Sequence, residues 1–104
     1  MNILLSTLKE ELATVKRLEK KYSQELTEFP QGSFIVRKIR DRKYGYFTYR
    51  EVGKVKQRYI GAVTDEDIAY YKSLVAKRKK LKEKLKSIRA QKKVLERALR
   101  GKTE

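Results

Sequence analysis

The chain has 104 residues, the size of one domain, and carries 28 Lys and Arg against 13 Asp and Glu, a net charge of +15. It contains neither Cys nor His, which excludes a disulfide framework, a thiolate metal site and the usual general base near neutral pH. So dense a positive charge favours a polyanionic partner. Because only 39% of the residues are apolar, we expect apolar stripes rather than a large core.

The chain shows no pattern of a targeting or membrane segment. Its apolar run near the start, Ile3 to Leu5, is short and follows no cation, unlike a signal peptide. No stretch approaches the roughly 18 apolar residues of a membrane span. We therefore expect a cytoplasmic protein that has no membrane partner.

Residues 2–29 are predicted to form a helix that ends before Pro30. Its acidic and basic residues balance. One stripe repeats in steps of three and four and contains a single charged member: Leu5, Leu8, Leu12, Val15, Glu19, Tyr22, Leu26 and Phe29.

Residues 33–62 are rich in β-branched and aromatic residues, which predicts three antiparallel strands. We expect the strands at Ser33–Ile39, Tyr44–Val52 and Val55–Ala62. The predicted turns contain Asp41 with Arg42 and Gly53 with Lys54. The second turn predicts four cross-strand pairs: Val52 with Val55, Glu51 with Lys56, Tyr49 with Arg58, and Phe47 with Ile60.

Alternation along these strands separates two faces. The apolar face is expected to pack on the helix ends and contains Phe34, Val36, Phe47, Ile60 and Ala62. The opposite face is expected to meet solvent and contains Arg37, Tyr44, Tyr46, Thr48, Arg50, Gln57 and Tyr59. The alternative is that these tyrosines are ordinary sheet residues covered by the helices.

Residues 65–100 are predicted to form a longer helix. Thr64 is a good N-cap, and Asp67 three residues later completes an approximate capping box. The helix ends at Arg100, before Gly101. Its stripe again steps by three and four: Leu74, Arg78, Leu81, Leu85, Ile88, Lys92, Leu95 and Leu99.

The two stripes predict one α+β domain, residues 1–104. Two long helices form an antiparallel coiled-coil-like pair, with a three-stranded β-meander inserted between them. One register places Glu19 opposite Leu81 and within reach of Arg78, and places Leu8 opposite Lys92. The alternative is a homodimer through the long helix.

Positive charge is concentrated in two segments: residues 33–62 hold nine cations and two carboxylates, and residues 72–100 hold thirteen and two. Tyrosines can stack on bases, and Arg and Lys can bind phosphates. We therefore expect a protein that binds DNA or RNA. The candidate contacts in the sheet are Arg37, Arg40, Arg42, Lys43, Tyr44, Tyr46, Arg50, Lys54, Lys56, Arg58 and Tyr59. Those in the long helix are Lys77, Lys80, Lys84 and Arg89.

No motif indicates catalysis. The five glycines are scattered and form no phosphate-binding loop, and no pair of carboxylates has the spacing of a metal site. We expect a non-enzymatic protein without cofactor or metal.

Pro30 to Val63 resembles a family of small uncharacterised proteins of phages and bacterial mobile elements. The matching residues are Gly32, Ser33, Tyr44, Tyr46, Tyr49, Arg50, Gly53, Lys54, Val55, Lys56, Tyr59, Ile60 and Gly61. A related strand pattern occurs in some transposases and in arm-type DNA-binding domains of tyrosine integrases. The chain departs from the family at Val52, where Asn is more usual, and at Gly45, where Tyr is. The resemblance implies a mobile-element setting.

Two other functions fit the same sequence. A phage-encoded inhibitor, such as an anti-CRISPR protein, would use the basic surfaces against a ribonucleoprotein. A coiled-coil oligomerisation module would use the helices alone.

Overall fold

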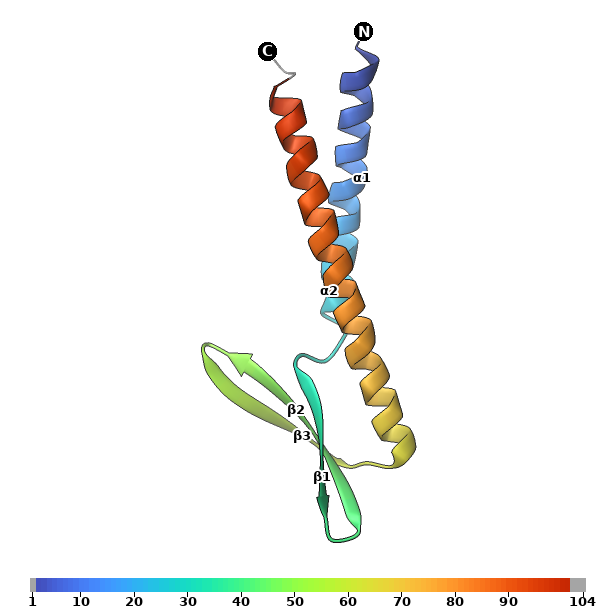
Figure 1. The fold of residues 1–104 in the computed structure, drawn as a ribbon, viewed down its shortest axis with the longest axis vertical. Coiled ribbons are helices and arrows are strands. Elements are labelled where there is room, and N and C mark those ends of the chain that lie inside the picture. The colour runs from blue at the N-terminus through green and yellow to red at the C-terminus, as the bar shows by residue number, and fades with distance from the viewer. Residues whose placement is uncertain (1, 102–104) are drawn as a thin grey trace. The chain divides into compact units, whose positions relative to one another are not determined.

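The computed structural model describes residues 2–101 and confirms the α+β fold, with two helices flanking a three-stranded antiparallel β-meander of order β1-β2-β3 (Figure 1). The elements are α1 (Ile3–Leu26), β1 (Ser33–Ile39), β2 (Arg42–Glu51), β3 (Lys54–Ala62) and α2 (Asp65–Arg100). They form two compact units. The helical unit contains α1 and α2 from Lys80 onward, and the sheet unit is Glu28–Lys79.

Side chains fix both ends of α1. The Asn2 Oδ1 atom accepts hydrogen bonds from the backbone N–H groups of Leu4, at 3.1 Å, and Leu5, at 3.3 Å. The helix ends at Leu26, so the predicted end at Phe29 is wrong. The reason lies at Thr27, whose N–H and hydroxyl both donate to the Gln24 carbonyl oxygen, at 3.2 and 2.7 Å, and close the last turn.

In the helical unit α1 and α2 run antiparallel (Figure 1) and bury Val15, Leu81 and Leu85. The Lys92 Nζ atom donates a 2.9 Å hydrogen bond to Glu19 Oε1, and Arg89 Nε lies 3.4 Å from Glu19 Oε2. Coiled-coil packing of the two stripes stays a prediction.

The predicted helix register is wrong. Glu19 was expected opposite Leu81 and near Arg78, but its partners lie about three turns further along α2. Heptad spacing alone permits several registers. The observed register pairs the half-buried carboxylate of Glu19 with Lys92, which was expected opposite Leu8.

The ion pair gives the helical unit a pH dependence. The hydrogen bond from Lys92, helped by Arg89, holds the pKa of Glu19 below its ordinary 4.5. A lowered pKa stabilises the folded state above the unfolded-state pKa, and this stabilisation is lost as the pH falls through the folded-state pKa. We expect Glu19→Gln to lower the melting temperature at about pH 7 and to flatten the loss of stability on acidification to about pH 3.

Thermal melts followed by circular dichroism at both pH values measure this effect. The exposed Glu10 of the same helix serves as the control, because Glu10→Gln removes one negative charge without breaking this pair. Equal melting curves for the two variants would contradict the assignment.

In the sheet unit the register of β2 and β3 differs from the predicted one by two residues. Glu51 pairs with Lys54, Tyr49 with Lys56 and Phe47 with Arg58, so all four predicted pairs are wrong. The turn consists of Val52 and Gly53, with φ of 52° and 74°, rather than Gly53 and Lys54. Positive φ at both central residues is what a type I′ hairpin requires, and its twist matches that of the flanking strands.

Two further details of the strands correct the prediction. Ile39 pairs with Arg42, so the first turn is Arg40–Asp41 and Arg42 belongs to β2. The pairing of β2 and β3 is irregular between Gly45 and Tyr46, where it passes over Ile60. This bulge moves Ala62, which pairs with Tyr44, from the expected apolar face to the tyrosine face.

The apolar face packs on the first half of α2, as expected. Phe47 is only 1% exposed, and its ring centroid lies 5.3 Å from that of Phe34 and 5.7 Å from that of Tyr71 on α2. Gly45 lets Phe34 and Val63 approach, because a Cβ there would lie 2.9 Å from the Phe34 ring. Sequence reasoning identified neither Tyr71 as the packing partner of Phe34 and Phe47 nor Gly45 as a position of close packing.

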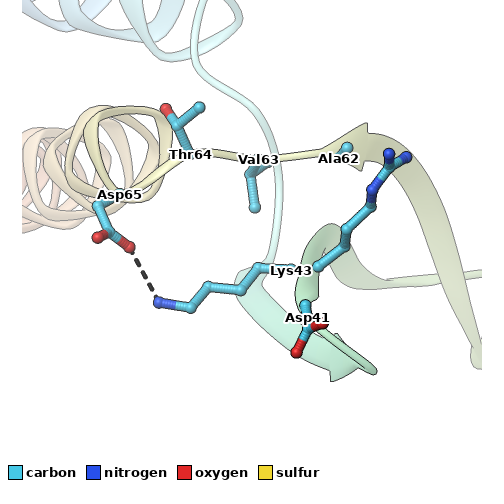
Figure 2. Close-up of a pocket in the computed structure, with 7 residues that line it drawn as sticks. Asp41, Lys43, Ala62, Val63, Thr64 and Asp65 are labelled. Carbon is cyan, nitrogen blue, oxygen red and sulfur yellow. Dashed lines mark hydrogen bonds and ion pairs between the residues drawn. The ribbon is translucent and has the colours of Figure 1, made fainter.

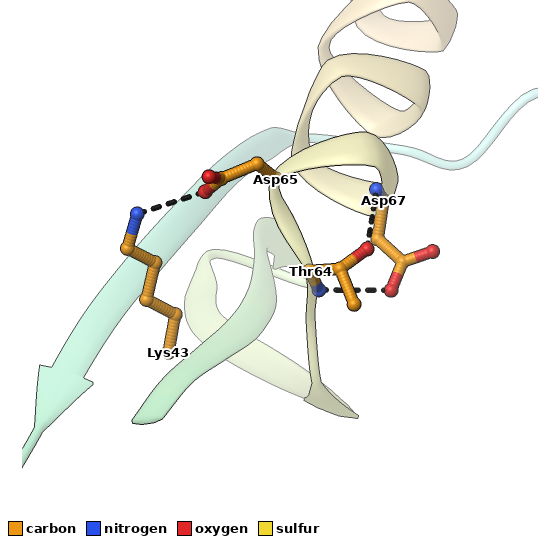
Figure 3. Close-up of polar contacts among 4 residues, drawn as sticks. All are labelled: Lys43, Thr64, Asp65 and Asp67. Atoms are coloured by element: carbon orange, nitrogen blue, oxygen red, sulfur yellow. Dashed lines mark hydrogen bonds and ion pairs between the residues drawn. The ribbon is translucent and has the colours of Figure 1, made fainter. Parts of the chain in front are cut away.

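The predicted capping box of α2 is confirmed (Figure 3). The Asp67 N–H donates to Thr64 Oγ1 at 3.1 Å, and the Thr64 N–H donates to Asp67 Oδ2 at 2.9 Å. The Lys43 Nζ atom of β2 donates to Asp65 Oδ1 at 2.9 Å. These bonds fix the start of α2 beside the sheet within the same unit.

Candidate nucleic-acid interface

One face of the sheet collects three tyrosines. The pairing places Tyr46 between Ile35 and Tyr59, and Tyr44 between Arg37 and Ala62, so these two rows share a face. The Tyr59 ring centroid lies 5.3 Å from that of Tyr46 and 6.4 Å from that of Tyr44. The three rings therefore form one cluster, as alternation along the strands predicted.

Arginines surround this cluster. The Arg37 guanidinium carbon lies 5.2 Å from the centroid of the Tyr46 ring, a cation–π geometry that holds both side chains in place. Arg50, paired with Val55, and Arg42, paired with Ile39, occupy the two ends of the same face. We name this surface the Tyr–Arg face, and its members are Arg37, Arg42, Tyr44, Tyr46, Arg50 and Tyr59.

The Tyr–Arg face is open to solvent, and its charged side chains are all positive. Tyr59 is 59% exposed, while Tyr44 and Tyr46 are half-buried by their neighbours. The strand residues on this face include no Asp or Glu, because Glu51, the acidic residue within the strands, pairs with Lys54 on the opposite face. No described carboxylate forms an ion pair with its arginines. Its apolar flanks, the exposed Ile35, Ile39 and Val55, were not foreseen as part of a site.

The other predicted contacts in the sheet do not join this face. Lys43, Lys54, Lys56 and Arg58 lie on the opposite face. The Lys56 Nζ atom is 3.4 Å from Glu51 Oε2, and the Arg58 guanidinium lies 5.6 Å from the Phe47 ring centroid. Arg40 is in the first turn. The predicted nucleic-acid contacts in the strands therefore lie on two opposite faces of the sheet.

A shallow pocket at the β1–β2 turn, about 470 Å³ in volume, does not suit a phosphate (Figure 2). Arg42 and Lys43 line it, but so do Asp41 and Asp65. The hydrogen bond from Lys43 holds the pKa of Asp65 below its usual value, so this carboxylate stays charged near neutral pH. Lys43 is thus engaged within the protein.

The long helix presents a separate set of cations. Lys77, Lys80 and Lys84 are exposed and follow one another at spacings of three and four, which aligns them on one side of α2. None of the three forms an ion pair with a described residue. Arg89 differs, because it lies against Glu19 in the helical unit.

Within residues 2–101, no cluster of three or more acidic, His or Cys side chains is placed to bind a metal ion. No helix in that range is both long and apolar enough to cross a bilayer.

Fold and surface together define a small, strongly basic α+β protein in which helices flank a β-meander with an open Tyr–Arg face. The chain belongs to the family described as Domain of unknown function (DUF6788), whose model matches residues 6–69. The matched region covers α1 from Ser6 onward, the whole sheet and the first turn of α2. No curated protein and no solved structure matches the chain.

Proposed function

We propose that this protein binds nucleic acid, with little sequence preference, through the Tyr–Arg face and the lysines of α2. The observation that carries the proposal is a sheet face with three arginines, three tyrosines and no carboxylate, opposite the face that packs on α2.

The chemistry of this face suits a polynucleotide. The exposed ring of Tyr59 offers a stacking surface for a base, and its neighbours Tyr44 and Tyr46 hold it in place. Arg37 and Arg50 present guanidinium groups that bind phosphate in a bidentate manner. Stacking and phosphate contacts are largely independent of base identity, which is the reason for expecting weak sequence preference.

A pair of charge-matched variants tests the proposal. Arg37→Gln/Arg50→Gln removes two cations from the Tyr–Arg face, while Lys38→Gln/Arg58→Gln removes two exposed cations from the opposite face. Each lost phosphate contact lowers the slope of log affinity against log salt by about one. We expect the first variant to lower the slope by about two and the second, the control, to leave it nearly unchanged.

The measurement is a salt-titrated binding series with labelled duplex DNA, single-stranded DNA and structured RNA. Equal losses for both variants would show that charge acts without a defined face. Absence of binding to all three probes at about 50 mM salt would refute the proposal itself.

The phage or mobile-element setting is a further part of the proposal and is supported by the resemblance of the hairpin sequence. An inhibitor of a ribonucleoprotein would use the same basic surfaces. Tight binding to one effector complex, with weak binding to free nucleic acid, would favour that role.

Oligomerisation is a second candidate, favoured by one observation in the helical unit. Val94 is 65% exposed and lines a groove of about 430 Å³ with Ala90, Leu95 and Glu11. A stable multimer in analytical ultracentrifugation, unchanged by Lys→Gln substitutions in α2, would support it.

A further inference from the structure

The β2–β3 hairpin continues beyond the edge of β1. The pairing of β1 with β2 stops at Ser33 and Thr48, whereas β2 and β3 remain paired as far as Glu51 and Lys54. Residues 49–56 therefore form a two-stranded extension, the β-arm, which projects past the start of β1 (Figure 1). Every residue from Arg50 to Lys56 is exposed.

The tip of the β-arm is strained and apolar. Val52 has a φ of 52° and is 96% exposed. A β-branched residue is disfavoured in this left-handed region, which Gly and Asn adopt far more readily. At this exposure, packing within the chain does little to offset the strain. An exposed, strained residue of this kind points to a role in binding a partner rather than in stabilising the fold.

Cations surround the apolar tip. Lys54 follows it directly, Arg50 and Lys56 lie further along the two strands, and Val55 forms a second apolar surface, 62% exposed, beside Arg50. Glu51 is the one carboxylate in the β-arm, and it lies against Lys56. The β-arm thus combines a protruding methyl-bearing tip with flanking positive charge.

We propose that the β-arm inserts Val52 between stacked base pairs of duplex DNA from the minor groove and kinks the duplex. The inference rests on the proposed nucleic-acid binding and adds the class of substrate. Apolar wedges flanked by cations act in this way in proteins that bend DNA. Here Arg50 and Lys54 would contact the phosphates on either side of the inserted tip.

The geometry favours DNA over duplex RNA. The minor groove of B-DNA is narrow, about 6 Å, so that a slender hairpin tip meets both of its walls. The minor groove of A-form RNA is wide and shallow and would leave the cations of the β-arm on one side without a phosphate. A base stacked on Tyr59 does not involve the tip, so single strands would not require Val52.

Val52→Asn separates this role from a purely structural one. Asn tolerates the left-handed conformation of the turn and adds no charge, so the fold and the cations remain. We expect a higher melting temperature, about a tenfold weaker affinity for a duplex of about 30 base pairs, and loss of its bending. The affinity for single-stranded DNA should not change. Val52→Phe retains an apolar wedge and is expected to retain bending.

Energy transfer between dyes at the two duplex ends measures the bend, and fluorescence anisotropy measures affinity. The inference is overturned if the parent protein binds a duplex without bending it, or if Val52→Asn bends DNA like the parent. Tighter binding of the parent to single strands or duplex RNA than to duplex DNA overturns it as well. Each of these results leaves nucleic-acid binding standing, whereas a parent that binds no nucleic acid removes both proposals.

Discussion

Replacing Gly32 by Ala is expected to destabilise the sheet unit by about 3 kcal/mol or more, a large part of the stability of a small domain. Gly32 has a φ of 91° and directly precedes β1. A Cβ at this position would overlap the carbonyl oxygen of Thr48 and lie 2.8 Å from the carbonyl carbon. The neighbouring atom belongs to the backbone of a paired strand, so it cannot move without disturbing the ladder.

A second glycine provides the control for this effect. Gly53 also has a positive φ, 74°, but an added Cβ there meets no atom within 4 Å. Gly53→Ala therefore isolates the conformational cost, about 1–2 kcal/mol, from the steric one. Urea unfolding followed by circular dichroism gives both values. If Gly32→Ala costs no more than Gly53→Ala, the close approach to Thr48 is not what makes Gly32 necessary.

The sequence predicted the tyrosine cluster but not the partners across the strands, and one physical reason explains both outcomes. Side chains alternate with a period of two, so a register error of two residues leaves every side chain on its face. Tyr46 and Tyr59 were therefore placed together correctly. The error arose because a turn with Val52 at positive φ is locally unfavourable, so local preference pointed to Gly53 and Lys54.

The bulge explains where the face assignment failed. It adds Ile60 to β3 without a partner on β2, and every later residue of β3 changes face. Ala62 therefore appears beside Tyr44. Nothing in the alternating pattern marks Ile60 as the extra residue. Beyond it the shifted pairing continues as far as Val63, whose N–H donates to the Lys43 carbonyl oxygen.

Contacts between distant segments were the least predictable. Asp65 was assigned to the start of α2, where it favours the helix dipole, but it also binds Lys43 from β2. Glu19 interrupts the apolar stripe of α1, and its partners could not be chosen among the cations of α2 from spacing alone. These contacts engage Lys43 and Arg89, two cations of the predicted interface, within the protein. Local sequence patterns cannot predict such long-range pairs.

Of the expected effects on function, the largest is the loss of affinity for nucleic acid as the salt concentration rises. The Tyr–Arg face offers Arg37, Arg42 and Arg50, and α2 offers Lys77, Lys80 and Lys84. If these cations make about six phosphate contacts, affinity should fall about a thousandfold between about 50 and 200 mM salt. The physical reason is the release of condensed counterions, which becomes less favourable as the bulk salt concentration rises.

The two sets of cations can be told apart by the same measurement. Lys77→Gln/Lys80→Gln/Lys84→Gln should lower the salt slope for duplex DNA by about three, to the value that the Tyr–Arg face alone supports. These side chains are exposed and unpaired with described carboxylates, so the substitutions should leave the melting temperature nearly unchanged. An unaltered slope in this variant would confine the interface to the sheet. A slope near zero in the parent protein would mean that stacking rather than charge holds the polynucleotide.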